Sequence, residues 1–105
     1  MIKNLNETDW AALKNETSNA VAIDVRTPEE WAEGIIPASD MLNIMNPQSF
    51  VAGLENLNKE DTFFIYCRSG ARSMQACQIM EQYGFKNVVN LEGGIMAWSG
   101  EIVLP

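Results

Sequence analysis

Cys67 is the residue of this chain best suited to do chemistry, because it follows the apolar segment Thr62–Tyr66 and opens the stretch CRSGARS. Gly70 permits a tight loop whose backbone N–H groups turn inward. A helix predicted from Arg72 points its free N–H groups and positive dipole end at the thiol. With the charge of Arg68 and Arg72, these features lower the pKa of a thiol from about 8.5 to below 7. The pattern predicts a nucleophilic Cys67 in an anion-binding loop.

The main alternative for any cysteine is plain packing, since free cysteine often behaves as a small hydrophobic residue. For Cys67, the adjacent glycine and two arginines favour the reactive interpretation. For Cys77 the balance reverses, because it lies within a predicted helix near Met74 and Met80. We expect Cys77 to pack in the core, and a resolving thiol is the alternative.

Composition excludes several other kinds of site. The 105 residues include 7 Lys+Arg, 14 Asp+Glu and no His, which gives a net charge of −7. The lack of histidine excludes His-based catalysis and most zinc sites, so we expect neither a metal nor a cofactor. An acidic chain is a poor partner for nucleic acid. With no apolar run near the roughly 20 residues of a membrane span and no signal-like start, we expect a cytoplasmic protein that binds no membrane.

Charge is distributed unevenly along this acidic chain. Between residues 62 and 80 the only charged side chains are Arg68 and Arg72. An isolated basic patch on an acidic protein favours an anionic ligand.

Alternating strand and helix patterns must position these residues. We predict strands at 2–5, 20–25, 41–45, 62–66 and 86–90, and helices that end near residues 15, 34, 57, 83 and 98. Strands that alternate with helices indicate an α/β fold with a mostly parallel sheet, and the length suits one domain over residues 1–105. Active groups of such sheets gather at the carboxyl ends of the strands, which is where Cys67 is expected.

Three motifs together resemble the rhodanese (sulfurtransferase) family: AIDVRTPEEWAEGIIPAS, CRSGARS and NLEGGIMAWSG, in that order. The resemblance covers the chain and implies a single rhodanese domain with a central, mainly parallel five-stranded sheet flanked by helices. The first motif departs from the family pattern. The family usually has His where Ile35 stands and Gly where Ala38 stands, so local packing and an acceptor contact are expected to differ.

The resemblance implies persulfide chemistry at Cys67. Its thiolate would take sulfur from thiosulfate or another small anionic sulfane donor and pass it to cyanide, a thiol or a sulfur-acceptor protein. The N–H groups of residues 68–72 would hold the transferred sulfur, and the two arginines would bind the sulfonate oxygens. The expected substrate-binding residues are Arg68, Ser69, Gly70, Ala71 and Arg72. The expected supporting residues are Asp24, Arg26 and Ser73, with Arg26 paired to Glu29 or Glu30.

Two other functions remain open at this point. A small rhodanese domain also serves as a sulfur carrier or a docking module with little turnover. A phosphatase or arsenate reductase is a minor alternative, because some phosphatases share the fold. Those enzymes place five residues between the cysteine and the arginine, whereas four separate Cys67 from Arg72. The smaller loop suits one sulfur atom better than a phosphate.

Overall fold

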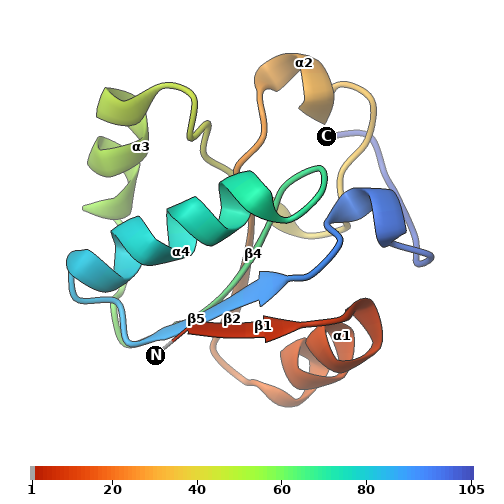
Figure 1. The fold of residues 1–105 in the computed structure, drawn as a ribbon, viewed down its shortest axis with the longest axis horizontal. Helices are drawn as coiled ribbons and strands as arrows, with labels where there is room; N and C mark the ends of the chain where they lie inside the picture. Colours follow the sequence, from red (N-terminus) through yellow and green to blue (C-terminus); the bar gives the residue numbers. More distant parts are fainter. Residues whose placement is uncertain (1) are drawn as a thin grey trace.

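One five-stranded sheet forms the centre of the computed structural model, which describes residues 2–105; Met1 lies outside them. The strands are β1 (Ile2–Leu5), β2 (Ala20–Asp24), β3 (Ser39–Met41), β4 (Thr62–Tyr66) and β5 (Asn87–Leu91). Their order is β1-β5-β4-β2-β3, and every neighbouring pair is parallel. The α/β class with a central parallel sheet is thus confirmed. Because every pair is parallel, all strands end at one edge of the sheet, and Figure 1 shows the arrows of β1 and β5 pointing the same way.

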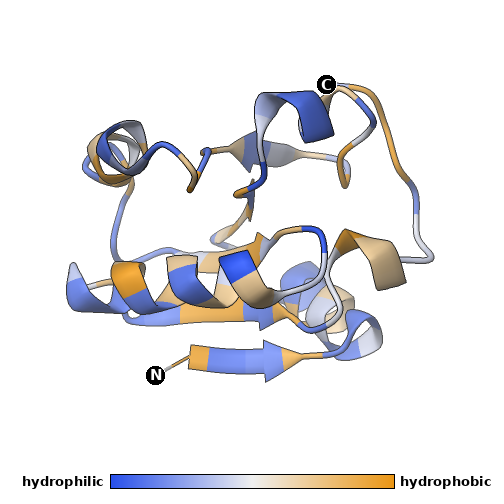
Figure 2. Cartoon of the chain, turned by 45° about the horizontal axis from the view of Figure 1, so that its top comes forward, coloured by the Kyte–Doolittle hydropathy of each residue, from blue (hydrophilic) through white to orange (hydrophobic). Residues whose placement is uncertain are grey.

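Helices cover both faces of the sheet. They are α1 (Glu7–Glu16), α2 (Pro28–Trp31), α3 (Pro47–Leu54), α4 (Ala71–Gln82) and the 3₁₀ turn η1 (Ile95–Ala97). Residues of α3 and α4 pack into one apolar cluster, whereas residues of α1 and η1 pack into a second cluster on the opposite face. Figure 2 shows the hydrophobic colour concentrated in the strands beneath α4. Within residues 2–105, no helix is long and apolar enough to cross a membrane.

The central strand β4 is buried on both faces, as its unbroken apolar sequence predicts. Phe63 and Ile65 face the α3–α4 side, and Phe64 and Tyr66 face the α1 side. All four side chains are fully buried. Because sides alternate along a strand, the next residue, Cys67, turns toward the α3–α4 cluster.

The strand predicted at 41–45 is misplaced, since β3 spans Ser39–Met41. Leu42 and Ile44 are half-buried against the core, and their apolar spacing gave the strand-like pattern. Their N–H groups donate at the carboxyl end of β2, to the carbonyls of Asp24 (3.0 Å) and of the next residue, Val25 (3.2 Å). The residue before β3, Ala38, has a left-handed φ of 63°, at the position where the rhodanese pattern usually has glycine.

The last helix is also shorter than predicted. A helix over 92–98 was expected, and only the 3₁₀ turn η1 forms. Gly93 and Gly94 have φ values of 83° and 60°, so the chain cannot be helical before Ile95. The helices predicted to end near residues 34 and 57 also finish sooner, at Trp31 and Leu54.

Candidate active site

The Cys67 thiol lies at the carboxyl end of β4, directly before α4. Its Sγ accepts hydrogen bonds from the Gly70 N–H (3.1 Å) and the Ser73 hydroxyl (3.3 Å). Burial alone would raise the pKa of Cys67, but donation by the Ser73 hydroxyl and by the N–H groups of residues 73, 70 and 69 outweighs it, so this pKa is lowered. We expected arginine charge to contribute strongly, whereas hydrogen bonds make the largest favourable contributions.

The loop of residues 67–70 turns its N–H groups inward because its carbonyls are bound on the outside. The carbonyls of Cys67 and Arg68 accept hydrogen bonds from the N–H groups of Ile95 (2.9 Å) and Met96 (3.0 Å). Gly94 lets η1 approach this closely, since a Cβ there would overlap the Arg68 carbonyl. Gly70, with a φ of 106°, makes the turn into α4. The expected tight loop around Gly70 is therefore present.

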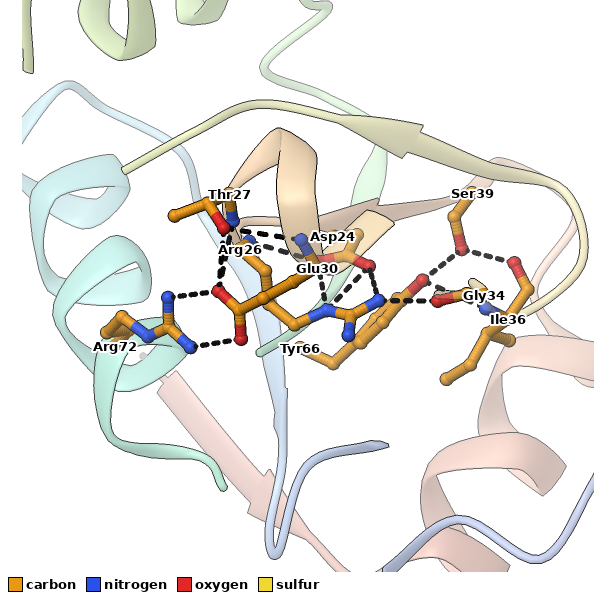
Figure 3. Close-up of polar contacts among 9 residues, drawn as sticks. All are labelled: Asp24, Arg26, Thr27, Glu30, Gly34, Ile36, Ser39, Tyr66 and Arg72. Carbon is orange, nitrogen blue, oxygen red and sulfur yellow. Dashed lines mark hydrogen bonds and ion pairs between the residues drawn. The ribbon is translucent and has the colours of Figure 1, made fainter. Parts of the chain in front are cut away.

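Arg72 binds a carboxylate of the protein itself. Its two terminal nitrogens donate to Glu30 Oε1 (2.8 Å) and Oε2 (2.9 Å), which joins α4 to α2 (Figure 3). Glu30 also belongs to the capping box of α2 with Thr27. The hydrogen bonds from Arg72 lower the pKa of Glu30 to about 2. Arg72 thus lies beside the loop, but its charge is already paired.

Arg26 does not pair with Glu29 or Glu30, and that expectation is wrong. It turns back to Asp24, two residues earlier, through Nε (3.0 Å) and Nη2 (2.7 Å). The same Nη2 donates to the Gly34 carbonyl at 2.6 Å (Figure 3). Burial lowers the pKa of Arg26, but the Asp24 carboxylate outweighs it and the pKa is raised. A buried ion pair without additional hydrogen bonds would be costly. In this protein Arg26 has them, and it ties the end of β2 to the segment after α2.

Tyr66 holds the segment of residues 34–39 from the side opposite to Arg26. Its hydroxyl accepts a hydrogen bond from the Ile36 N–H (3.1 Å) and donates to the Ser39 hydroxyl (2.8 Å). Burial raises the pKa of Tyr66, so it stays a neutral donor. Ile35 is buried and forms a two-way backbone bridge with Val103. Residues 34–39 are therefore held rigidly beside the ends of β2 and β4.

An open pocket of about 450 Å³ lies next to the Cys67 loop. Its lining residues are Arg26, Glu30, Glu33, Arg68, Ile95 and Met96. Arg68 is exposed, and its guanidinium has no hydrogen-bond or ion-pair partner in residues 2–105. Of the two arginines in the stretch CRSGARS, Arg68 is the one whose charge is available to an anion.

The remaining predicted residues are divided between the loop and its support. Ser69 contributes its N–H to Cys67, and Ala71 begins α4 with an exposed side chain. Ser73 is completely buried beneath the loop. Cys77 is buried in the core, as predicted, and burial raises its pKa to about 12. In the part of the chain that the structure describes, no three His, Cys, Asp or Glu side chains come together as metal ligands would.

Two residues that support the Cys67 loop were not predicted from the sequence. Glu30 was expected as one of two alternative partners of Arg26, and nothing local signals that it binds Arg72 of α4 instead. Asn90 is 2% exposed and donates to the Gly70 carbonyl at 3.3 Å. Its signal was a polar residue inside the buried run NVVNL.

Comparison with known proteins gives this geometry its context. Residues 7–101 match the family model described as a rhodanese-like domain. A sulfurtransferase of Allochromatium vinosum is 40% identical over 99 residues, which cover 90% of this chain and 89% of that protein. A putative sulfurtransferase of Bacillus subtilis is 41% identical over 101 residues, which cover 92% of this chain and 93% of that protein.

Solved structures agree with the sequence comparison. The crystal structure of a rhodanese-like domain protein from Staphylococcus aureus has a TM-score of 0.84 and 29% identity, and the match covers 98% of each chain. A Rhodopseudomonas palustris protein of unknown function, described as a possible tyrosine phosphatase, has a TM-score of 0.79 and 31% identity over 97% of this chain and 85% of its own. From the family match, the two sulfurtransferase relatives and the shared fold, it follows that this chain belongs to the rhodanese-like family.

Proposed function

We propose that this protein is a sulfurtransferase that carries sulfane sulfur from thiosulfate, or a similar small anionic donor, to a thiol through a persulfide on Cys67. Family membership and the sulfurtransferase relatives support sulfur transfer in general. The observation that carries the finer proposal is the arrangement around Cys67 Sγ, which accepts donors at 3.1 and 3.3 Å and whose pKa is lowered. This arrangement favours the thiolate form of Cys67, which is the nucleophile of the proposed reaction, without a histidine base.

In the first half-reaction, the Cys67 thiolate attacks the outer sulfur of thiosulfate. A bond forms between Sγ and that sulfur, the sulfur–sulfur bond of thiosulfate breaks, and sulfite leaves with the bonding electron pair. The negative charge of the persulfide then lies on its terminal sulfur, where inward N–H groups of the loop stabilise it. Arg68, exposed on the rim of the pocket, attracts the sulfonate oxygens.

In the second half-reaction, an acceptor thiolate attacks the terminal sulfur. The bond to Sγ breaks, its electron pair returns to Cys67, and the acceptor leaves as a persulfide. Cyanide in the same role leaves as thiocyanate. Because the enzyme is modified between the two halves, we expect ping-pong kinetics.

The test is intact mass spectrometry of the protein mixed with thiosulfate under non-reducing conditions, then with cyanide. We expect a gain of one sulfur, about 32 Da, which cyanide removes and which Cys67→Ser never acquires. The matched control Cys77→Ala should gain the same mass. A mass gain that survives in Cys67→Ser would overturn the assignment of the nucleophile.

Steady-state assays on the same sample separate the remaining alternatives. Fast thiocyanate formation supports a turnover enzyme, whereas a persulfide that discharges only to one protein partner supports a sulfur carrier. Hydrolysis of p-nitrophenyl phosphate that depends on Cys67, with no gain of sulfur, would replace the proposal with a phosphatase.

A further inference from the structure

The carbonyl oxygen of Gly70 receives more hydrogen bonds than it has lone pairs. It accepts from the Met74 N–H (3.1 Å), the Ser73 hydroxyl (3.1 Å) and the Asn90 side-chain amide (3.3 Å). A carbonyl oxygen offers two lone-pair positions. Three donors therefore compete for two places. The Met74 N–H is fixed by the first turn of α4, so the competition lies between Ser73 and Asn90.

The Ser73 hydroxyl has one proton and two acceptors within reach. One acceptor is the Gly70 carbonyl at 3.1 Å and the other is Cys67 Sγ at 3.3 Å. Ser73 is completely buried, which removes solvent as a third partner. Donation to a thiolate is charge-assisted and stabilises the anion, whereas donation to the carbonyl leaves the sulfur without its side-chain donor.

Asn90 reaches Gly70 from the neighbouring strand. It lies on β5, between the buried residues Val89 and Leu91, and pairs across the sheet with Asn4 of β1. Its amide nitrogen donates to Asn4 Oδ1 (2.9 Å) as well as to Gly70. Its own oxygen, Oδ1, is buried without a hydrogen-bond partner in residues 2–105. The Asn90 side chain is thus held by its two donated hydrogen bonds, and one of them ends on the active-site loop.

We propose that Asn90 is a positioning residue: by occupying the Gly70 carbonyl together with the Met74 N–H, it directs the Ser73 hydroxyl to Cys67 Sγ. Asn90 touches neither the sulfur nor the substrate and acts through two intermediates. That this matters for sulfur transfer rests on the proposed function of Cys67. The hydrogen-bond relay itself concerns only the protonation of the thiol.

The test measures the alkylation rate of Cys67 by iodoacetamide as a function of pH, with peptide mass mapping to separate it from Cys77. Removing a hydrogen bond to a charged group raises the midpoint of this profile by about one pH unit, which is the shift expected for Ser73→Ala. We expect Asn90→Leu, which is similar in size, to raise the midpoint by roughly half as much. Asn4→Ala removes the other partner of Asn90 and should leave the midpoint unchanged.

The decisive sample is the double variant Ser73→Ala/Asn90→Leu. If Asn90 acts through Ser73, the alkylation midpoint of the double variant equals that of Ser73→Ala alone. An unshifted midpoint in folded Asn90→Leu, or a full additional shift in the double variant, would overturn the proposal. If Asn90→Leu does not fold, Asn90→Thr suits a strand, lacks the amide and gives the same test. Alkylation requires no sulfur donor, so this experiment tests the role of Asn90 even if the sulfurtransferase proposal fails.

Discussion

Cys67, in the loop before α4, and Cys77, in the middle of α4, show how the surroundings of a buried thiol change its pKa. Both are fully buried, and both belong to the apolar cluster beneath α3 and α4. Their pKa values nevertheless move in opposite directions, downward for Cys67 and up to about 12 for Cys77. The exposed area of the side chain therefore does not explain the difference between them.

The difference is where each sulfur stands relative to the peptide N–H groups of α4. In the middle of the helix these groups are consumed by helical hydrogen bonds, so Cys77 gains nothing to offset the loss of water. In front of the helix the first N–H groups have no helical partner, and the loop turns further donors inward. Cys67 meets those donors and the Ser73 hydroxyl.

The largest expected effect is the difference in sulfur-transfer rate between variants that lack one sulfur or the other. Cys67→Ser should lower sulfur transfer at least about a thousandfold, because the hydroxyl is a poor nucleophile at neutral pH. Cys77→Ala should keep nearly the full rate. Thiocyanate formation from thiosulfate and cyanide measures both. Comparable losses in the two variants would mean that Cys77 takes part in the cycle.

Chemical labelling of the wild-type protein should reveal the same contrast. At pH 7 we expect a maleimide to modify Cys67 about a hundredfold faster than Cys77, because the thiolate is the reactive form. In urea the two rates should converge. Time-resolved peptide mass mapping gives both rates, and equal rates in the folded protein would contradict the contrast in pKa.

The raised pKa of Cys77 also makes stability fall with pH. Between pH 9 and 10 the unfolded chain releases the Cys77 proton while the folded protein retains it, since the folded pKa is about 12. The folded state then binds more protons, so the free energy of unfolding declines by up to about 1.4 kcal/mol per pH unit. Cys67 has a lowered pKa in the folded protein, so its folded form binds no more protons than its unfolded form and adds nothing to this decline. Urea unfolding should show the decline in the wild type and a flatter profile in Cys77→Ala.

Below pH 9, Cys77→Ala tests the packing interpretation alone. Loss of one buried sulfur atom should cost about 1 kcal/mol of unfolding free energy, as a small core truncation does. Urea denaturation at pH 7 is the measurement. The exposed position Ser69 offers a control, since Ser69→Ala should leave stability unchanged within the error of the method.

The smallest effect concerns the ion pair at the front of α4. Glu30→Gln removes the carboxylate that binds Arg72, so two arginines instead of one become available to an anion. We expect the KM for thiosulfate to fall about threefold with little change in kcat. Glu33→Gln, on the same pocket but outside the ion pair, is the matched control. An unchanged KM in Glu30→Gln would restrict the role of Arg72 to joining α2 and α4.

The sequence predicted those features that arise from local chemistry. β4 and the tight turn at Gly70 follow from an unbroken apolar run and a glycine, and the structure has both. The same holds for the burial of Cys77, which sits on the inner side of a helix.

Contacts between distant segments were not predictable in this way. The partner of Arg72 stands 42 residues earlier in the chain, and Asn90 meets Gly70 only because β5 lies beside β4. Arg26 was misassigned for a related reason. Its partner, Asp24, is local, but the Arg26 Nη2 group that binds Asp24 also donates to the carbonyl of Gly34, eight residues later.

The sheet order has a consequence for how a newly made chain acquires its activity. The first strand made, β1, pairs with the last, β5, through matches such as Ile2 with Val88. The two N–H groups that bind the loop carbonyls come from Ile95 and Met96, later still. As the ribosome releases the chain from its N-terminus, Cys67 emerges well before β5 and residues 95–96 are available to pack around its loop. The pKa of the Cys67 thiol is therefore lowered only among the last events of folding, after a period in which it is an ordinary cysteine.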